Sequence, residues 1–246
     1  MENIVIIMAG GLGKRMKSEL PKVLHKIQNK PMLVHVIERA LELNPVKIYV
    51  IVGVYKNIIS STLEEYHLLK NIEFVNQDNP MGTGHAIQCC RKQLKDYQNH
   101  NVIILSGDVP LISKNTLDNM LDNLNSVKIL TTERDNPTGY GRIILKENKF
   151  QRIIEEKDCN EEERKCKKTN SGIYAFKSNL LYKYLPYLNN NNSQNEYYLT
   201  DIIEIIKNHE YIDIDIFNLS REKQIELSGV NTKEQLEELE EFLKNN

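Results

Sequence analysis

Short apolar runs alternate with segments of helical periodicity along the first 135 residues. Short β-rich runs predict strands at 4–8, 47–52, 73–75, 102–105 and 127–132, and those at 4–8 and 102–105 are apolar throughout. Between them, apolar residues recur at helical spacing over 32–43, 58–66, 83–94 and 116–124, with Thr83 as the cap of the third helix. Strands that alternate with helices in this way favour an α/β fold with a doubly wound, mostly parallel sheet.

The pattern changes after residue 135. The alternation on either side of Glu147-Asn148 predicts a β-hairpin. A charged segment over 159–168 predicts a solvated helix or loop, and strands are expected over 171–176 and 211–217 on either side of a helix containing 201–206. Thr232 and Gln235 predict a capping box for a last helix with an apolar face of Leu236, Leu239, Phe242 and Leu243. We expect one domain whose second half adds a substrate-facing β subregion.

Composition narrows the functional classes. A net charge of −2 over 246 residues gives no general attraction to nucleic acid or to a membrane. No apolar run reaches the roughly 18 residues of a membrane span, and no signal peptide is evident at the N-terminus. The four cysteines have no metal-ligand spacing and are expected to be reduced thiols, Cys89, Cys90, Cys159 and Cys166. These features predict a cytoplasmic protein. The sequence does not indicate its oligomeric state.

The glycine-rich stretch MAGGLGKRMKSELPKVLHKI follows the first predicted strand and fits neither common phosphate motif. A P-loop would require a glycine in place of Met8 and a hydroxyl in place of Arg15 around Gly13-Lys14. A dinucleotide fingerprint would require a third glycine in place of Met16. The stretch therefore needs another explanation.

Glycines placed directly after a parallel strand present bare backbone N–H groups at the carboxyl end of the sheet, where ligands bind in doubly wound folds. Arg15 and Lys22 add positive charge suited to phosphates, and Pro21 stiffens the approach to Lys22. The alternative is a tight turn followed by a solvated basic face. The two cations together favour phosphate binding.

Asp108 follows the apolar strand 102–105 within LSGDVP. A carboxylate at this rim of the sheet suits Mg²⁺, which keeps several waters and bridges substrate phosphates. The alternative is an aspartate that caps a turn before Val109-Pro110. The two interpretations are about equally supported by this segment alone.

The segment NQDNPMGTGHA carries another candidate. Gly82-Thr83-Gly84 opens a predicted helix whose N-terminus could face a ligand. Gln77 can both donate and accept hydrogen bonds, which suits one edge of a pyrimidine ring. The alternatives are a Gln77 side chain bonded to nearby backbone and a His85 side chain packed beside the sheet. We find no persuasive nucleophilic triad.

Taken in order, these segments resemble the signature of sugar-1-phosphate nucleotidylyltransferases. More closely, the chain resembles the uridyltransferase (pyrophosphorylase) domain of bacterial N-acetylglucosamine-1-phosphate uridyltransferase. The resemblance covers nearly the whole chain and is carried by eight blocks: the opening stretch through KPML, MGTGHA, SGDVPLI, NPTGYGRI, IIEEKD, NSGIYAF, NEYYLTDII and GVNTKEQL. It implies a Rossmann-like nucleotidyltransferase fold, with a nucleotide-binding half at 1–135, a sugar-phosphate-binding subregion at 136–231 and a C-terminal helix at 232–246.

The resemblance also implies roles for individual residues. Arg15 and Lys22 would be the catalytic phosphate-binding cations, and Asp108 and Asn231 would bind Mg²⁺. The nucleotide would be bound by Met8, Ala9, Gly10, Gly11, Gln77, Gly82 and Thr83. The sugar would be bound by Gly141, Glu155, Asn170 and Asn231.

The implied reaction is Mg²⁺-dependent: UTP and N-acetylglucosamine-1-phosphate give UDP-N-acetylglucosamine and pyrophosphate. Gly10, Lys14 and Ser106 depart from residues usual in the family. The chain contains no hexapeptide repeats, so we expect no acetyltransferase activity. Two alternatives remain: a sibling enzyme that uses another sugar phosphate or dTTP, and a catalytically silent module that binds nucleotide sugars.

Overall fold

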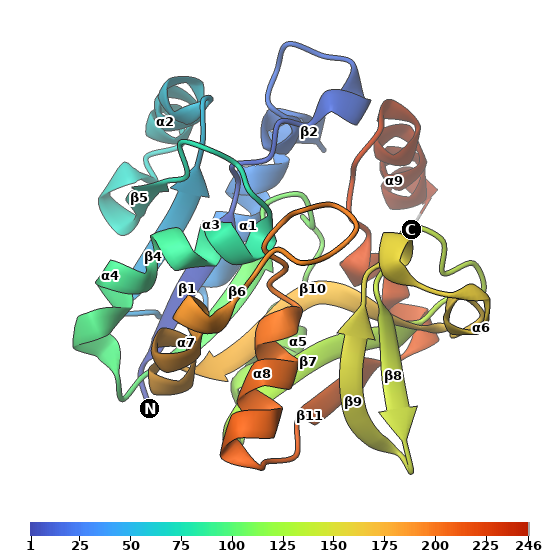
Figure 1. Ribbon diagram of the computed structural model, residues 1–246. Helices are drawn as coiled ribbons and strands as arrows, with labels where there is room; N and C mark the ends of the chain where they lie inside the picture. Colours follow the sequence, from blue (N-terminus) through green and yellow to red (C-terminus); the bar gives the residue numbers. More distant parts are fainter. Residues whose placement is uncertain (246) are drawn as a thin grey trace.

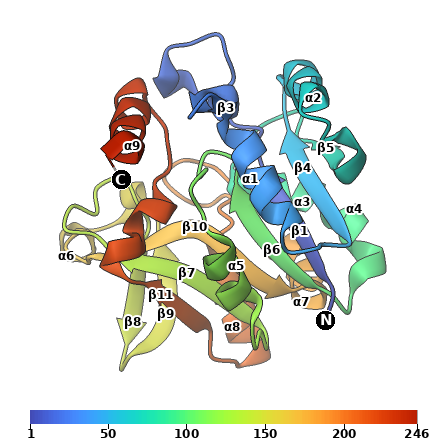
Figure 2. The same ribbon diagram turned by 180° about the vertical axis from the view of Figure 1, so that it is seen from behind.

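The computed structural model describes residues 1–245 and is built around a nine-stranded mixed sheet (Figures 1 and 2). A separate two-stranded sheet pairs β2 with β3. The strands are β1 Asn3–Met8, β2 Lys26–Ile27, β3 Lys30–Pro31, β4 Lys47–Val52, β5 Glu73–Asn76, β6 Asn101–Ser106, β7 Val127–Glu133, β8 Arg142–Lys146, β9 Lys149–Ile154, β10 Lys168–Lys177 and β11 Asp215–Leu219.

The main sheet runs in the order β11-β7-β10-β6-β1-β4-β5, with the β8–β9 hairpin joined through β10. Strand β1 pairs in parallel with both β6 and β4, and β4 pairs in parallel with β5. Strand β10 is antiparallel to β6 and β7. The predicted doubly wound, mostly parallel sheet is confirmed. The sequence did not reveal that β10 is inserted antiparallel between two strands of the first half.

Helices cover both faces of the sheet (Figures 1 and 2). One face packs against α1 Met32–Leu41, α2 Lys56–Glu65 and α5 Lys114–Leu121. The other face packs against α3 Thr83–Cys89, α4 Arg91–Leu94, α7 Ser178–Tyr184 and α8 Asp201–Glu210. Two further α-helices complete the described chain, the short α6 Glu161–Arg164 and α9 Lys233–Asn245, the latter near the C-terminus.

Alternation along the central strand explains the two cores. Val5 and Ile7 of β1 belong to the cluster under α1, whereas Ile4 and Ile6 belong to the cluster under α3 and α8. All four side chains are fully buried. A strand covered on both faces needs apolar residues at every position, which is why this run is continuous instead of alternating.

The hairpin prediction at Glu147-Asn148 is confirmed, because the pair joins β8 to β9 with φ values of 53° and 61°. Two other boundaries were wrong. The helix predicted over 83–94 is interrupted at Cys90 and forms α3 and α4. Thr83 was predicted to be its N-terminal cap, but Gly82 occupies the cap position and Thr83 is the first helical residue. The Thr83 hydroxyl accepts a hydrogen bond from Leu199 N instead of capping the helix.

The last strand was also predicted too long, because the chain turns through Tyr211 at a φ of 54° and β11 starts only at Asp215. At the last helix, Thr232 Oγ1 accepts from Gln235 N as predicted. The Gln235 side chain, however, accepts from Asn231 N, one residue earlier than a capping box requires.

A third apolar cluster holds the C-terminal helix against the segment after β1. Met16, Ile27 and Met32 pack there with Val230 and with Leu239 of α9. This packing brings the polypeptide around residue 230 close to the glycine-rich loop, although more than 200 residues separate them in the sequence. The position of Asn231 follows from it.

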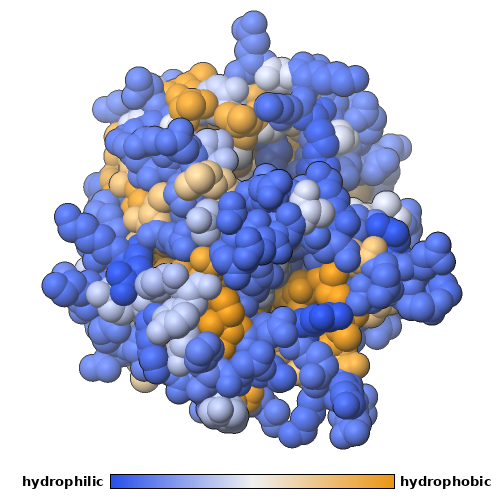
Figure 3. Space-filling view, viewed as in Figure 1, coloured by the Kyte–Doolittle hydropathy of each residue, from blue (hydrophilic) through white to orange (hydrophobic). Residues whose placement is uncertain are grey.

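Within residues 1–245, we find no helix that is both long and apolar enough to cross a bilayer. The face shown in Figure 3 is mainly hydrophilic, with scattered hydrophobic patches.

Candidate active site

The carboxyl ends of β1 and β6 lie side by side and form the floor of the site. Met8 pairs with Ser106, and Gly107 N donates to Met8 O at 2.9 Å. A side chain at position 107 would meet Met8 O at 3.1 Å, so a glycine keeps the two strand ends close. The loop after β1 and Asp108 therefore face the same space, as the sequence predicts for the rim of a parallel sheet.

The loop after β1 leaves its backbone donors free. Within residues 1–245, the N–H groups of Gly10, Gly11, Leu12 and Gly13 donate no hydrogen bond. Gly13 has a φ of 61°, and a Cβ there would lie 2.7 Å from the Cβ of Lys22. Only glycine allows both this turn and the passage of Lys22 beneath it. Free N–H groups in a tight loop are suited to bind anionic oxygens.

Two cations and two oxygen ligands meet at this rim. The Lys22 ammonium forms an ion pair with Asp108 Oδ2 and donates to Asn231 Oδ1 at 3.0 Å. Arg15 Nη2 donates to the same Asn231 oxygen at 2.9 Å. Asp108 and Lys22 are mostly buried, at 10% and 17% side-chain exposure, whereas Arg15 is exposed. The two expected phosphate-binding cations thus lie together with the two expected metal ligands.

Backbone contacts fix this arrangement. Val230 N donates to Asp108 O at 3.0 Å, which holds the adjacent Asn231 beside the end of β6. Ser106 Oγ donates to Asp108 Oδ1 at 2.5 Å. One carboxylate oxygen is therefore occupied by the serine, and the other faces Lys22.

Asp108 and Asn231 suit a divalent cation. The Lys22 ammonium contacts one oxygen from each, so these oxygens converge on a single positive centre. Carboxylate and amide oxygens are hard ligands of the type that Mg²⁺ prefers. No group of three or more His, Cys, Asp or Glu side chains able to hold a metal occurs in the described chain. A cation here would complete its shell with water and substrate oxygens, which is usual for Mg²⁺.

A cavity of about 290 Å³ opens on the glycine-loop side of this centre. Its wall includes Lys22, Asp108 and all seven residues predicted to bind the nucleotide, Met8, Ala9, Gly10, Gly11, Gln77, Gly82 and Thr83. The helix that begins at Thr83 has seven residues, and Gly82 and Thr83 at its start line this cavity. We call this the first cavity.

A second cavity of about 330 Å³ lies on the other side of Asp108. Its wall includes all four residues predicted to bind the sugar, Gly141, Glu155, Asn170 and Asn231. The two cavities share Met8, Thr83, Ser106 and Asp108. The charged centre therefore lies where a substrate in one cavity would meet a substrate in the other.

The second cavity is lined by hydrogen-bonded polar groups. Asn170 Nδ2 donates to the hydroxyl of Tyr174 at 2.6 Å, and Asn170 N donates to Gly141 O at 2.9 Å. The register of β10 shifts between Asn170 and Tyr174, which turns this part of the strand toward the cavity. Thr200 Oγ1 donates to Glu155 Oε1 at 3.0 Å. Burial raises the pKa of Glu155, while the Thr200 hydrogen bond lowers it.

Sequence reasoning missed several contributors. In the sequence Ser106 is only a departure from the family pattern, yet in the fold it orients Asp108. Thr200 orients Glu155, and Tyr140 lines the second cavity. The sequence suggests packing for His85, yet its ring contacts Gln77. No local pattern could have revealed the Ser106 and Thr200 contacts, because each depends on how two side chains meet in the fold.

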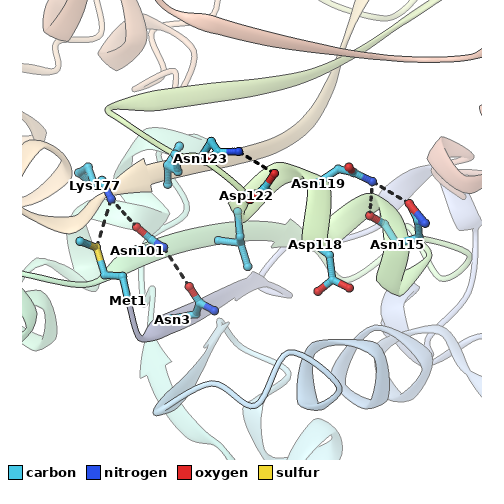
Figure 4. A pocket seen from close by; sticks show the side chains of 11 residues that line it. Met1, Asn3, Asn101, Asn115, Asp118, Asn119, Asp122, Asn123 and Lys177 are labelled. Carbon is cyan, nitrogen blue, oxygen red and sulfur yellow. Dashed lines mark hydrogen bonds between the residues drawn. The ribbon is translucent and has the colours of Figure 1, made fainter.

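Another cavity, of about 710 Å³, lies away from this centre at the opposite end of β1 and β6 (Figure 4). Asparagines dominate its wall, and Lys177 Nζ donates to Asn101 Oδ1 at 2.9 Å. It contains none of the predicted site residues. The geometry of the first two cavities therefore identifies the candidate site.

Comparison with known proteins agrees with the geometry. The family model described as nucleotidyl transferase matches residues 4–221. A protein of Acanthamoeba polyphaga mimivirus, named as a probable UDP-N-acetylglucosamine pyrophosphorylase, is 45% identical over 98% of this chain and 96% of its own length. The bifunctional protein GlmU of Clostridium botulinum (strain Eklund 17B / Type B) is 42% identical over 99% of this chain.

The chain spans about half of the bifunctional relative, 52% of its length. Among solved structures, a UDP-glucose pyrophosphorylase complexed with UDP-glucose aligns over 100% of both chains with a TM-score of 0.75 at 18% identity. This likeness supports the fold.

Proposed function

The chain belongs to the nucleotidyl transferase family, and from that premise we propose that it is a UDP-N-acetylglucosamine pyrophosphorylase. In this proposal, UTP and N-acetylglucosamine-1-phosphate give UDP-N-acetylglucosamine and pyrophosphate. The observation that carries it is the meeting of Arg15, Lys22, Asp108 and Asn231 at the boundary between two substrate-sized cavities. The mimivirus relative is 45% identical to this chain over 96% of its own length, and its name supports this choice of substrates.

The nucleotide would lie in the first cavity. The free N–H groups after β1 would face its phosphates, and the base would lie near Gln77 and Gly82. The sugar would lie in the second cavity, where Glu155 and Asn170 offer hydrogen bonds to its hydroxyl and acetamido groups. This arrangement brings the sugar phosphate beside the α-phosphate of the nucleotide at Asp108.

The sugar phosphate oxygen would attack the α-phosphorus in line, and pyrophosphate would leave on the opposite side. The attacking phosphate is already ionised, so no general base is needed, and positioning with charge stabilisation carries the catalysis. Lys22 would exchange its contact with Asp108 for the phosphates, and Arg15 would stabilise charge on the departing pyrophosphate. A Mg²⁺ ion held by Asp108 and Asn231 supplies charge that offsets the repulsion between the two phosphates.

We also propose that the enzyme is cytoplasmic. All four cysteines are free in the described chain, which suits a reducing compartment.

One assay tests the proposal directly. Pyrophosphate release is measured for UTP, dTTP, CTP, GTP and ATP, each with N-acetylglucosamine-1-phosphate, glucose-1-phosphate and other sugar phosphates. We expect the highest kcat/KM for UTP with N-acetylglucosamine-1-phosphate. A clear preference for dTTP or another sugar would identify a sibling enzyme, and absence of pyrophosphate release with every pair would contradict the enzymatic role.

A further inference from the structure

We propose that His85 is a positioning residue that locks the side-chain amide of Gln77 in one orientation and thereby makes the site select uracil over cytosine. The inference rests on the proposed function, because it concerns how the uridine base is read. Two contacts of the Gln77 amide and the position of its free oxygen carry it.

The first contact identifies which end of the amide is which. Gln77 Nε2 lies 3.1 Å from Gly82 O. A backbone carbonyl can only accept, so the amide atom that faces it must be the NH₂ group. Gly82 O is held in place because it also accepts from Ala86 N at 3.2 Å, in the first turn of α3. One hydrogen of the amide is therefore directed at a fixed acceptor.

The second contact uses the other hydrogen. Gln77 Nε2 also lies 3.1 Å from His85 Nδ1. Since Nε2 is a donor, Nδ1 must be the unprotonated nitrogen of a neutral imidazole. The ring proton is then on Nε2, which faces Cys89 Sγ at 4.0 Å. The side chains of Cys89, His85 and Gln77 thus form a chain in which each donor has a defined direction.

The consequence is that Gln77 presents only an acceptor to a ligand. Both hydrogens of its NH₂ group are used inside the protein, and within residues 1–245 its Oε1 accepts no hydrogen bond. This oxygen lies next to Gly10, because a Cβ added to Gly10 would lie 3.3 Å from it. Gly10 and Gln77 both line the first cavity. Gln77 is otherwise 5% exposed, so a base that fills the first cavity would cover this oxygen and leave a mismatched contact without a hydrogen bond.

A fixed acceptor restricts which base fits. Uracil has a single N–H donor on its pairing edge, N3–H, whereas N3 of cytosine is itself an acceptor. With uridine bound, Gln77 Oε1 must therefore accept from N3–H, and cytidine in the same place would set two lone pairs against each other. If the amide could rotate, its NH₂ group would serve cytosine equally well. Gly82 O and His85 Nδ1 together oppose that rotation, because a flipped amide would turn its oxygen toward both acceptors.

The test is the ratio of kcat/KM for UTP to kcat/KM for CTP, measured by pyrophosphate release with the same sugar phosphate. His85→Leu removes the acceptor at Nδ1 and replaces the ring with an apolar side chain of similar bulk. We expect the UTP/CTP ratio to fall by about tenfold, the scale of one misplaced buried hydrogen bond. His85→Asn can restore an acceptor near the position of Nδ1, and we expect it to recover most of the ratio.

The control is Cys89→Ser, which keeps an acceptor for the Nε2 proton and should leave the ratio at the wild-type value. The ratio does not depend on the fraction of folded enzyme, so a purely structural role of His85 would lower both kcat/KM values and leave the ratio unchanged. An unchanged ratio in His85→Leu would overturn this inference alone. A wild-type protein that releases no pyrophosphate from any triphosphate would overturn the proposed function as well.

Discussion

The two cavities that meet at Asp108 are built in different ways. The first is lined largely by three short segments, at 8–11, 77–83 and 106–108, which follow strands β1, β5 and β6 of the same sheet. The second gathers side chains from 139–141, 155, 170–174, 199–200 and 227–231, which lie far apart in the sequence. A glycine loop can accept any nucleotide phosphate, whereas a wall of side chains from many segments can be shaped for one sugar.

The charge of the two cavities differs as well. Lys22 and Glu196 line the first, and Arg15 lies nearby at the shared boundary, where it donates to Asn231. The second contains Glu155, and behind it Asp201 and Asp158 line an adjoining cavity of about 370 Å³. Cations suit the side that receives a triphosphate, while carboxylate and amide groups suit the hydroxyls of a neutral ring. The comparison therefore assigns phosphate chemistry to the boundary and sugar recognition to the second cavity.

The strongest test of the shared boundary is removal of divalent metal, which should affect both substrates together. We expect excess EDTA to reduce turnover by about a thousandfold or more, since several kcal/mol of charge stabilisation would disappear. Asp108→Asn should weaken the response to added Mg²⁺. The measurement is pyrophosphate release against Mg²⁺ concentration. Full turnover in EDTA would rule out the assignment of Asp108 and Asn231 as metal ligands.

The next effect in size concerns the two cations. Lys22→Ala or Arg15→Ala should lower kcat/KM by roughly 10²–10⁴, the scale expected when a charged group no longer stabilises the transition state. Arg15→Lys should also be poor, because a point charge cannot reproduce the planar guanidinium. Thermal melts should change little for Arg15, which is exposed.

Matched controls exist in the same loop. Lys14 and Lys17 are exposed and lie within two residues of Arg15, but in the described chain neither side chain shares the hydrogen bond that Arg15 donates to Asn231. Their alanine variants should retain wild-type kcat/KM. If Lys14→Ala and Arg15→Ala reduced kcat/KM equally, the contribution of the loop to catalysis would come from its general positive charge. The specific hydrogen bond from Arg15 to Asn231 would then not account for it.

The first cavity could be predicted from local sequence, and the second mostly could not. An apolar run followed by glycines and Arg15, or by Gly-Asp108, already indicates a sheet rim with free N–H groups and a carboxylate. The meeting of Asn231 with Lys22 depends on the packing of Val230 and Leu239 against Met16, which no short-range pattern reveals. Gly141, Glu155 and Asn170 follow from family resemblance alone. The antiparallel placement of β10, which brings Asn170 to the site, was not predicted.

A smaller effect, limited to the KM of one substrate, should distinguish the two cavities. Glu155→Gln keeps the side-chain volume and an oxygen for Thr200, but it removes the one carboxylate that the second cavity does not share with the first. We expect KM for the sugar phosphate to rise about 10-fold or more, the scale of a hydrogen bond to a charged group, while KM for UTP stays unchanged. Gln77→Met should give the mirror result, with KM raised for UTP alone. A rise in both KM values for either variant would break the division between the cavities.

The smallest expected effect concerns stability, and it tests the acidic wall behind the second cavity. Burial, followed by the charges of Glu155, Glu204 and Asp158, raises the pKa of Asp201 from 3.8 to about 6. The folded protein therefore binds this proton more tightly than the unfolded chain. The stabilisation is fully present below pH 3.8 and is lost as the pH rises through about 6.

Asp201→Asn removes that loss, so the variant should be more stable than wild type at pH 7 by about 1 kcal/mol, a value reduced for partial exposure to solvent. The two free energies of unfolding should converge near pH 4 in urea titrations. Asp213→Asn offers a control, because Asp213 is an exposed partner of Lys149 and should show no such convergence. Equal stability of Asp201→Asn and wild type at pH 7 would mean that the wall behind Glu155 is well hydrated. The charge difference between the two cavities would then reside in the residues of their own walls, Lys22 and Glu196 in the first and Glu155 in the second.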